Sequence, residues 1–184
     1  MFLCASVVLA VLIGLIRGGK WQNFITFKFR KTWLVILAMV IQLAIFNPLW
    51  DKYVGAGMLN NYLYVLSIAI LVIFLLVNID ISGLRILGLG IVSNGVAIVA
   101  NGGHMPSSLE ALKRILPQET ISQLQSGSAA YNVVLITSET KFSFLCDLFY
   151  IPHINVYSVG DILIALGAFI TVQQIMLHRK VLML

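Results

Sequence analysis

Five long apolar runs, almost free of charged residues, constrain this chain more than any other feature of its sequence. They cover residues 1–16, 33–50, 61–78, 83–100 and 156–177. A helix needs about 20 mostly apolar residues to cross a hydrocarbon core that is about 30 Å thick. Because 60% of the residues are hydrophobic and only 10% are charged, the chain lacks the polar side chains that cover a soluble domain. The sequence therefore predicts an all-α membrane protein, a five-helix transmembrane bundle.

Basic residues follow the first and the last apolar run, and they predict which way the helices face. Residues 17–32 form a basic connector, and His178, Arg179 and Lys180 follow the last run. Cytoplasmic segments of membrane proteins carry an excess of Lys and Arg. We therefore expect the N-terminus outside and the C-terminus inside. Residues 1–16 have no positive n-region and no small-residue cleavage site, so we interpret them as a membrane helix rather than a signal peptide.

The connector interleaves cations with aromatic rings, a pattern that is typical of a segment lying at the level of lipid headgroups. The net charge of +5 in such a protein indicates anionic lipid rather than nucleic acid. The alternative is that these cations only fix the orientation of the chain. The expected headgroup contacts are Arg17, Lys20, Lys28, Arg30 and Lys31.

The runs divide the chain into three parts. Residues 1–100 hold four predicted transmembrane helices and the connector, and residues 156–184 hold the fifth helix with a cytoplasmic tail. Residues 101–155 are longer than an ordinary connection, and loops of such length are usually functional or disordered. Local signals favour order, so we expect a small extracytoplasmic cap of short helices and loop.

Two short helices are predicted within the cap. Ser107 and Glu110 have the spacing of a capping box, which would begin the first of them. Ile121 and Leu124 would share the apolar face of the second. Residues 132–137 read as a short extended run.

The junction of the fourth helix with the cap is the main candidate site. Residues 101–106 read Asn-Gly-Gly-His-Met-Pro, in which the glycine pair lets the backbone turn sharply or approach a ligand closely. The Asn101 amide offers donors and acceptors, and His104 can exchange a proton. Asn94 shares a helix face with Asn101, and this face should point into protein or a wet crevice. The alternative is a plain helix C-cap, after which Pro106 prevents continuation.

Two acidic residues extend the candidate site. Asp147 lies in the apolar stretch 142–151, which should fold back onto the bundle and could bring the carboxylate near Asn101, His104 or Asp161. Asp161 follows Ser158 in a Ser-x-x-acid pattern, so it either caps the fifth helix or lines a ligand site within the membrane. The ligand-binding candidates are Asn94, Asn101, Gly102, Gly103, His104, Met105, Asp147 and Asp161.

The sequence contains no metal-binding spacing, phosphate loop or catalytic motif, so we expect no metal and no cofactor. We expect a non-enzymatic binding or accessory subunit that holds a lipid, a small ligand or a partner protein at its outer face. One alternative is a transporter or channel component, with Asn94, Asn101 and Asp161 along a wet path. Another is an intramembrane enzyme that uses His104 with Asp147 or Asp161.

Four motifs resemble those of a bacterial multi-pass membrane protein family that is known only as a domain of unknown function. The Asn-Gly-Gly-x-Met-Pro box is the most specific, and the resemblance covers nearly the whole chain. Cys146 departs from the glycine expected before the aspartate. The resemblance implies a protein of the bacterial cytoplasmic membrane and supplies no activity. The motifs are Arg17-Gly18-Gly19-Lys20, Asn101-Gly102-Gly103-x-Met105-Pro106, Asp147 within a Phe/Leu segment, and Ser158-Val159-Gly160-Asp161.

Overall fold

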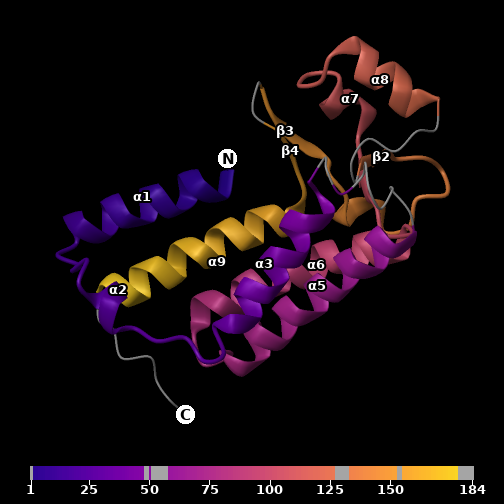
Figure 1. Cartoon of the computed structure of the whole chain (residues 1–184). Coiled ribbons are helices and arrows are strands. Elements are labelled where there is room, and N and C mark those ends of the chain that lie inside the picture. The colour runs from indigo at the N-terminus through magenta and orange to yellow at the C-terminus, as the bar shows by residue number, and fades with distance from the viewer. Residues whose placement is uncertain (1, 48–49, 51–57, 127–132, 153–154, 178–184) are drawn as a thin grey trace.

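The computed structural model describes residues 2–47, 50, 58–126, 133–152 and 155–177, and this part of the chain is mostly helical (Figure 1). The basic residues His178, Arg179 and Lys180, which predict a cytoplasmic C-terminus, lie outside the described residues. The helices are α1 (Phe2–Ile16), α2 (Asn23–Thr26), α3 (Trp33–Ile45), α5 (Met58–Val77), α6 (Ser82–Ala100), α7 (Leu109–Leu112), α8 (Gln118–Gln125) and α9 (Val159–Met176), with a 3-10 turn η1 (Ser143–Leu145).

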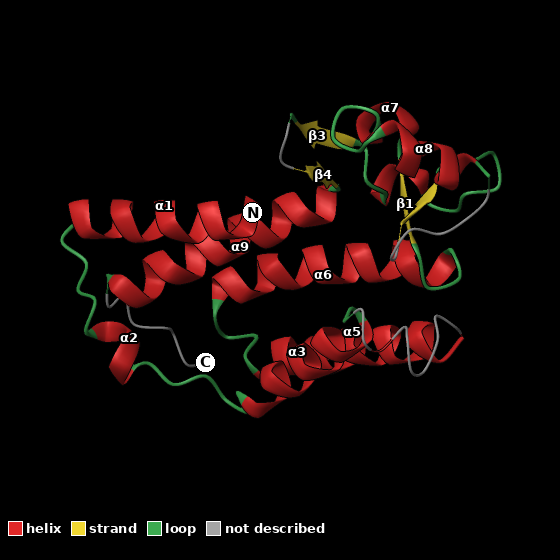
Figure 2. Cartoon of the chain, turned by 45° about the horizontal axis from the view of Figure 1, so that its top comes forward, coloured by secondary structure: helices red, strands yellow, loops and turns green. Residues whose placement is uncertain are grey.

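Five apolar helices lie side by side in a row, in the order α1, α9, α6, α5 and α3 (Figure 2). Helix α1 runs parallel to α9, since the Ser6 hydroxyl donates to the carbonyl of Ala165 near its start and the N–H of Lys20 donates to the carbonyl of Met176 at its end. The other neighbours in the row are antiparallel. Helix direction therefore alternates along the sequence, as it must when successive helices cross one layer.

Three of the described helices, α5, α6 and α9, are long and apolar enough to cross a membrane. Helices α1 and α3 are also apolar, but they have 15 and 13 residues. At 1.5 Å per residue they are about 22 and 20 Å long, shorter than the hydrocarbon core. The five helices are thus present, whereas five membrane crossings remain a prediction.

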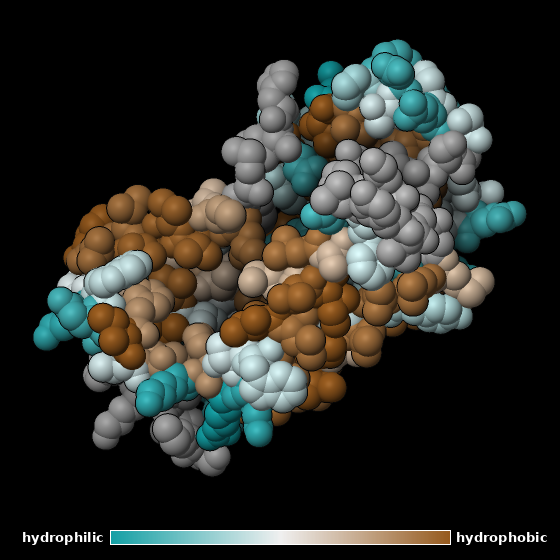
Figure 3. Space-filling model, viewed as in Figure 1, coloured by the Kyte–Doolittle hydropathy of each residue, from teal (hydrophilic) through white to brown (hydrophobic). Residues whose placement is uncertain are grey.

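Exposed apolar side chains cover the outer faces of the row. Figure 3 shows this brown surface between the teal patches of the cap and of the connector. A soluble monomer rarely exposes a contiguous apolar surface of this extent, so the surface indicates a membrane location. Its members include Leu9, Leu12, Val40, Leu43, Leu66, Ile73, Leu89, Val92 and Leu166.

Helix α6 occupies the middle of the row, and glycines lie at its contact with α9. On α6, Gly83 and Gly90 are seven residues apart, and they face Gly160 and Gly167 of α9. A Cβ atom on Gly90 would lie 2.4 Å from the carbonyl oxygen of Gly160, and one on Gly167 would lie 2.3 Å from the backbone nitrogen of Leu87. Without side chains at these points the two backbones touch, which is how helices associate in lipid.

The described part of the cap contains two small sheets besides its short helices. Buried apolar residues, among them Ile121 and Leu124, hold α7 and α8 together as their spacing predicts. Of the extended run predicted at residues 132–137, Val133–Leu135 form β2. This strand pairs in parallel with β1, whereas β3 and β4 pair in antiparallel. The cap is therefore more than short helices and loop. The strands are β1 (Met105–Ser107), β2 (Val133–Leu135), β3 (Phe149–Ile151) and β4 (Asn155–Tyr157).

The prediction of a capping box at Ser107 and Glu110 is wrong. Ser107 is the last residue of β1, and the N-cap of α7 is Ser108, which makes no side-chain cap bond. The hydroxyl of Ser107 instead donates to Oδ2 of Asp147, at 3.0 Å. Strand pairing and a buried carboxylate hold this serine, so it is not available to the helix that follows.

Candidate functional site

The chain leaves α6 through the predicted Asn-Gly-Gly turn. The N–H groups of Asn101 and Gly103 both donate to the carbonyl of Ile98, which closes the helix. Gly102 and Gly103 have φ angles of 72° and 90°, in the left-handed region that glycine adopts without strain. This geometry is the C-cap that the sequence gives as the alternative to a ligand site.

The side chain of Asn101 fastens the cap to the helix end. Its Nδ2 donates to the carbonyls of Ala97, at 2.7 Å, and Lys141, at 2.9 Å. Its Oδ1 accepts from the N–H of Lys141, at 3.0 Å. Backbone partners take up both ends of this amide, so its clearest role is to join two segments. Binding of a ligand by Asn101 stays a prediction.

A pocket of about 560 Å³ opens beside the same turn, and we call it the cap-end pocket. The carbonyl of Gly102 accepts a hydrogen bond from Nδ2 of Asn61, at 2.8 Å, so the turn is tied to the first residues of α5. A Cβ atom on Gly103 would lie 2.6 Å from the Cβ of Asn61, which explains the glycine there. The lining residues are Met58, Asn61, Tyr62, Val65, Val99, Gly102 and Gly103.

Asn94 and Asp161 meet between α6 and α9. Nδ2 of Asn94 donates to Oδ1 of Asp161, at 2.9 Å, and the hydroxyl of Ser158 donates to Oδ1 of Asn94, at 2.8 Å. Ser158 and Asp161 also form the predicted capping box, with bonds of 2.9 and 3.0 Å. The amide of Asn94 thus faces protein, as a membrane setting requires, and it links α6 to the first turn of α9.

Asp147 is held in the cap beside this cluster and is 8% exposed. Its N–H donates to the carbonyl of Pro106, its carbonyl accepts from the N–H of Ser108, and its side chain accepts from Ser107. Burial and, to a smaller extent, the nearby charge of Asp161 raise the pKa of Asp147, the hydrogen bond from Ser107 lowers it, and the net result is a rise from 3.8 to about 7. Asp147 and Asp161 are therefore close enough for their charges to interact.

His104 and Met105 complete the predicted junction. Nδ1 of His104 is buried and has no hydrogen-bond partner among the described residues. Within that part of the chain, no described bond joins His104 to Asp147 or Asp161. Met105 is buried in an apolar cluster with Cys146, so it serves packing. Burial, followed by the charge of Asp147, raises the pKa of the Cys146 thiol to about 11, which keeps the thiol protonated and unreactive.

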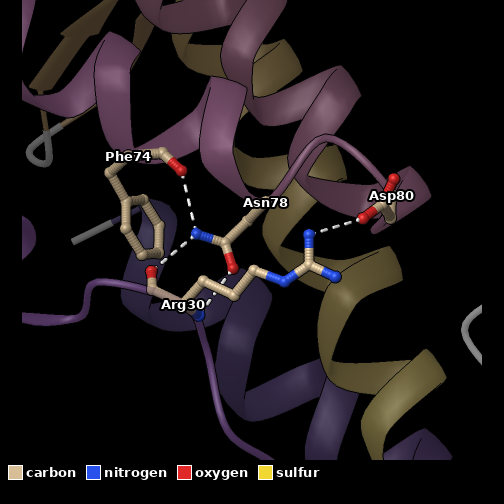
Figure 4. Close-up of polar contacts among 4 residues, drawn as sticks. All are labelled: Arg30, Phe74, Asn78 and Asp80. Atoms are coloured by element: carbon tan, nitrogen blue, oxygen red, sulfur yellow. Dashed lines mark hydrogen bonds and ion pairs between the residues drawn. The ribbon is translucent and has the colours of Figure 1, made fainter. Parts of the chain in front are cut away.

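At the ends of the helices that lie away from the cap, Asn78 holds the connector in place. Its Oδ1 accepts from the N–H of Arg30, at 2.8 Å, and its Nδ2 donates to the carbonyls of Arg30 and Phe74, both at 2.9 Å (Figure 4). The guanidinium of Arg30 then reaches Asp80, with 3.0 Å between Nη1 and Oδ2. Sequence reasoning missed Asn78, the last residue of the third apolar run, because its partner lies 48 residues away.

The hydrogen bonds between Asn78 and Arg30 form a clamp on the connector. A pocket of about 330 Å³ lies beside this clamp, and we call the pocket the connector-end pocket. Of the five cations predicted to contact lipid headgroups, Lys28 and Arg30 line it. Arg17 is placed elsewhere, since its Nη1 donates to Oε1 of Gln173 on α9, at 2.8 Å. The lining residues are Thr26, Phe27, Lys28, Arg30, Asn78, Asp80 and Ile81.

A row of apolar helices with a polar cap and a basic connector defines a helical protein with a membrane location. The chain belongs to the family of unknown function DUF5317, whose model matches residues 26–173. An uncharacterized protein of Thermotoga maritima is 28% identical over 172 residues, which cover 90% of this chain and 87% of the relative. No solved structure matches the chain. Membership of the family confirms the resemblance noted from the motifs, while the Asn-Gly-Gly box as a mark of the family stays a prediction.

Proposed function

We propose that this protein crosses the bacterial cytoplasmic membrane five times, with the cap outside and the connector in the cytoplasm. The alternating directions of the five helices support this topology, because each successive helix ends on the opposite side of the layer. The charges support the orientation: Lys28, Arg30 and Lys31 gather at the connector end, where Arg85 lies in the first turn of α6. An excess of Lys and Arg is typical of cytoplasmic segments.

Within that topology we propose a non-enzymatic binding or accessory role at the outer face, and the cap-end pocket carries this proposal. Ligand sites commonly enclose about 300–1,000 Å³ and combine an apolar lining with a few polar groups. Here Val65, Val99 and Met58 supply the apolar part, whereas Asn61 and Tyr62 supply the polar part. Such a lining suits an amphipathic molecule, and a membrane lipid is the most accessible one at this position.

The two alternative functions receive less support from the same geometry. An acid–base enzyme needs His104 within reach of a carboxylate, and the described bonds of Asp147 and Asp161 go to other groups. A transport path needs polar groups that face an opening. Asn94 and Asp161 instead bond to each other, and the Asn101 amide bonds to the backbone.

Replacing Val65 with tryptophan should fill the cap-end pocket and exclude a bound lipid from it. The added ring would occupy volume that a bound lipid needs, so the side chain and the lipid would compete for the same space. A loss of about 1 kcal/mol in the free energy of binding lowers the affinity about fivefold, and we expect at least that loss. The measurement is native mass spectrometry of the full chain in mild detergent, supplied with phosphatidylethanolamine and phosphatidylglycerol.

Leu66→Trp is the matched control, because Leu66 is 49% exposed and does not line the pocket. It should retain lipid as the unmodified protein does. Equal retention of lipid by the Val65 and Leu66 variants would show that the pocket is not the binding site.

A further inference from the structure

We propose that the connector-end pocket is a second, separate site, which binds the phosphate of an anionic membrane lipid. It lies at the ends of the helices away from the cap, whereas the cap-end pocket lies at the ends next to the cap. The proposal does not depend on the outer-face role. The proposal rests on a hollow of about 330 Å³ with two cations on its wall and a side-chain clamp that fixes one of them.

The clamp makes Arg30 a preorganised cation. Asn78 is 3% exposed and bonds both the N–H and the carbonyl of Arg30, so the backbone at this position is held on both sides. Asp80 then holds one end of the guanidinium, as Figure 4 shows. A surface arginine normally loses rotamer freedom when it binds, and fixing it in advance lowers that entropic cost.

The held guanidinium keeps donors for an anion. Arginine has five N–H donors in a planar fork, which matches two oxygens of a phosphate. The ion pair described for Arg30 uses Nη1, and the side chain remains 58% exposed. With Lys28 on the same wall, two positive charges stand against the single carboxylate of Asp80. The pocket is therefore cationic on balance and suits one phosphodiester.

The surroundings favour a lipid phosphate over a free one. Phe27 and Ile81 form apolar parts of the pocket wall. Phe27 and Phe29 pack against the apolar cluster where α3 meets the end of α5. At the connector, to which both cations belong, the exposed apolar surface of the helices gives way to a polar patch (Figure 3). A phosphate attached to acyl chains meets both surfaces at this boundary, whereas inorganic phosphate uses only the cations.

Calorimetric titration of the full chain in detergent with short-chain lipids tests the proposal. Dihexanoyl phosphatidylglycerol should bind about tenfold more tightly than dihexanoyl phosphatidylcholine, and inorganic phosphate at least about tenfold more weakly than the anionic lipid. Arg30→Gln should weaken the binding of phosphatidylglycerol about tenfold, and Lys28→Gln severalfold. Arg30→Lys should recover only part of the loss, because lysine lacks the fork.

Lys113→Gln, an exposed lysine of the cap, is the matched control and should leave the affinity unchanged. Val65→Trp should also leave it unchanged, which separates this site from the outer-face role. Lys28→Gln supplies the test if Arg30→Gln does not fold. Equal binding of the two lipids, or wild-type affinity in the Arg30 and Lys28 variants, would overturn the proposal. Inorganic phosphate that binds as tightly as phosphatidylglycerol would overturn the assignment to a lipid.

Discussion

Gly90→Ala is expected to lower the free energy of unfolding by about 2 kcal/mol or more, although it adds only one methyl group. The new Cβ would lie 2.4 Å from the carbonyl oxygen of Gly160 and 2.8 Å from the backbone nitrogen of Ile164. Both atoms belong to the α9 backbone, which cannot move aside as a flexible side chain does. The two helices must move apart at this point, which weakens the close backbone packing of α6 on α9.

Gly88→Ala provides the control within the same helix. A Cβ atom there would meet only the side chain of Leu75, at 3.4 Å, which is ordinary van der Waals contact. This substitution should be neutral or slightly stabilising, because alanine is a better helix former than glycine. Reversible unfolding in mixed detergent micelles would measure both changes. Equal effects at Gly88 and Gly90 would contradict the packing of α6 on α9.

Asp147→Asn is expected to stabilise the protein at pH 8 and to remove a pH dependence that the unmodified protein shows. Burial of the carboxylate, together with the nearby charge of Asp161, raises its pKa from 3.8 to about 7. Below pH 4 the carboxyl is protonated in both the folded and the unfolded state, so the folded state bears no penalty. Between about pH 4 and 7 the unfolded state loses its proton while the folded state keeps it. Stability therefore falls as the pH rises through this window and levels off above it.

The size of this effect follows from the pKa shift. One pKa unit corresponds to about 1.4 kcal/mol, so the buried charge costs at most a few kcal/mol at pH 8. Asparagine has nearly the same shape and can still accept from Ser107, but it carries no charge. The thermal midpoint of the unmodified protein should thus be higher at pH 5 than at pH 8, and that of the variant should change less.

Glu139→Gln, at an exposed position of the cap, should retain the pH dependence of the unmodified protein. If the Asp147→Asn variant keeps the full pH dependence of the unmodified protein, Asp147 is not its source. If the variant is less stable than the unmodified protein at pH 8, the carboxylate stabilises the fold as an anion. Either result would contradict the prediction.

Features that depend on neighbouring residues were predictable from the sequence. The capping box of Ser158 and Asp161 forms because both members lie in the same turn of α9. Ile121 and Leu124 are buried because their spacing puts them on one face of α8. The turn after Asn101 has the glycines that a left-handed backbone requires.

Features that depend on distant partners were not predictable in the same way. Ser107 has the local pattern of a helix cap, yet Asp147, which lies 40 residues away, binds its hydroxyl. Asn78 looks like part of a turn, and only the folded chain brings the backbone of Arg30 to its amide. Asn61 likewise reaches Gly102 only when α5 and α6 pair. Local spacing carries no information about such contacts, and both pockets are built from them.

The proposed topology is tested most directly by labelling introduced cysteines in intact bacterial cells with a membrane-impermeant maleimide. In a Cys4→Ser background, in which the native Cys146 is buried, Ser126→Cys would report on the cap and Thr26→Cys on the connector. We expect the cap position to react in intact cells and the connector position to react only after the membrane is opened. Labelling of the connector position, but not of the cap position, in intact cells would contradict the proposed orientation.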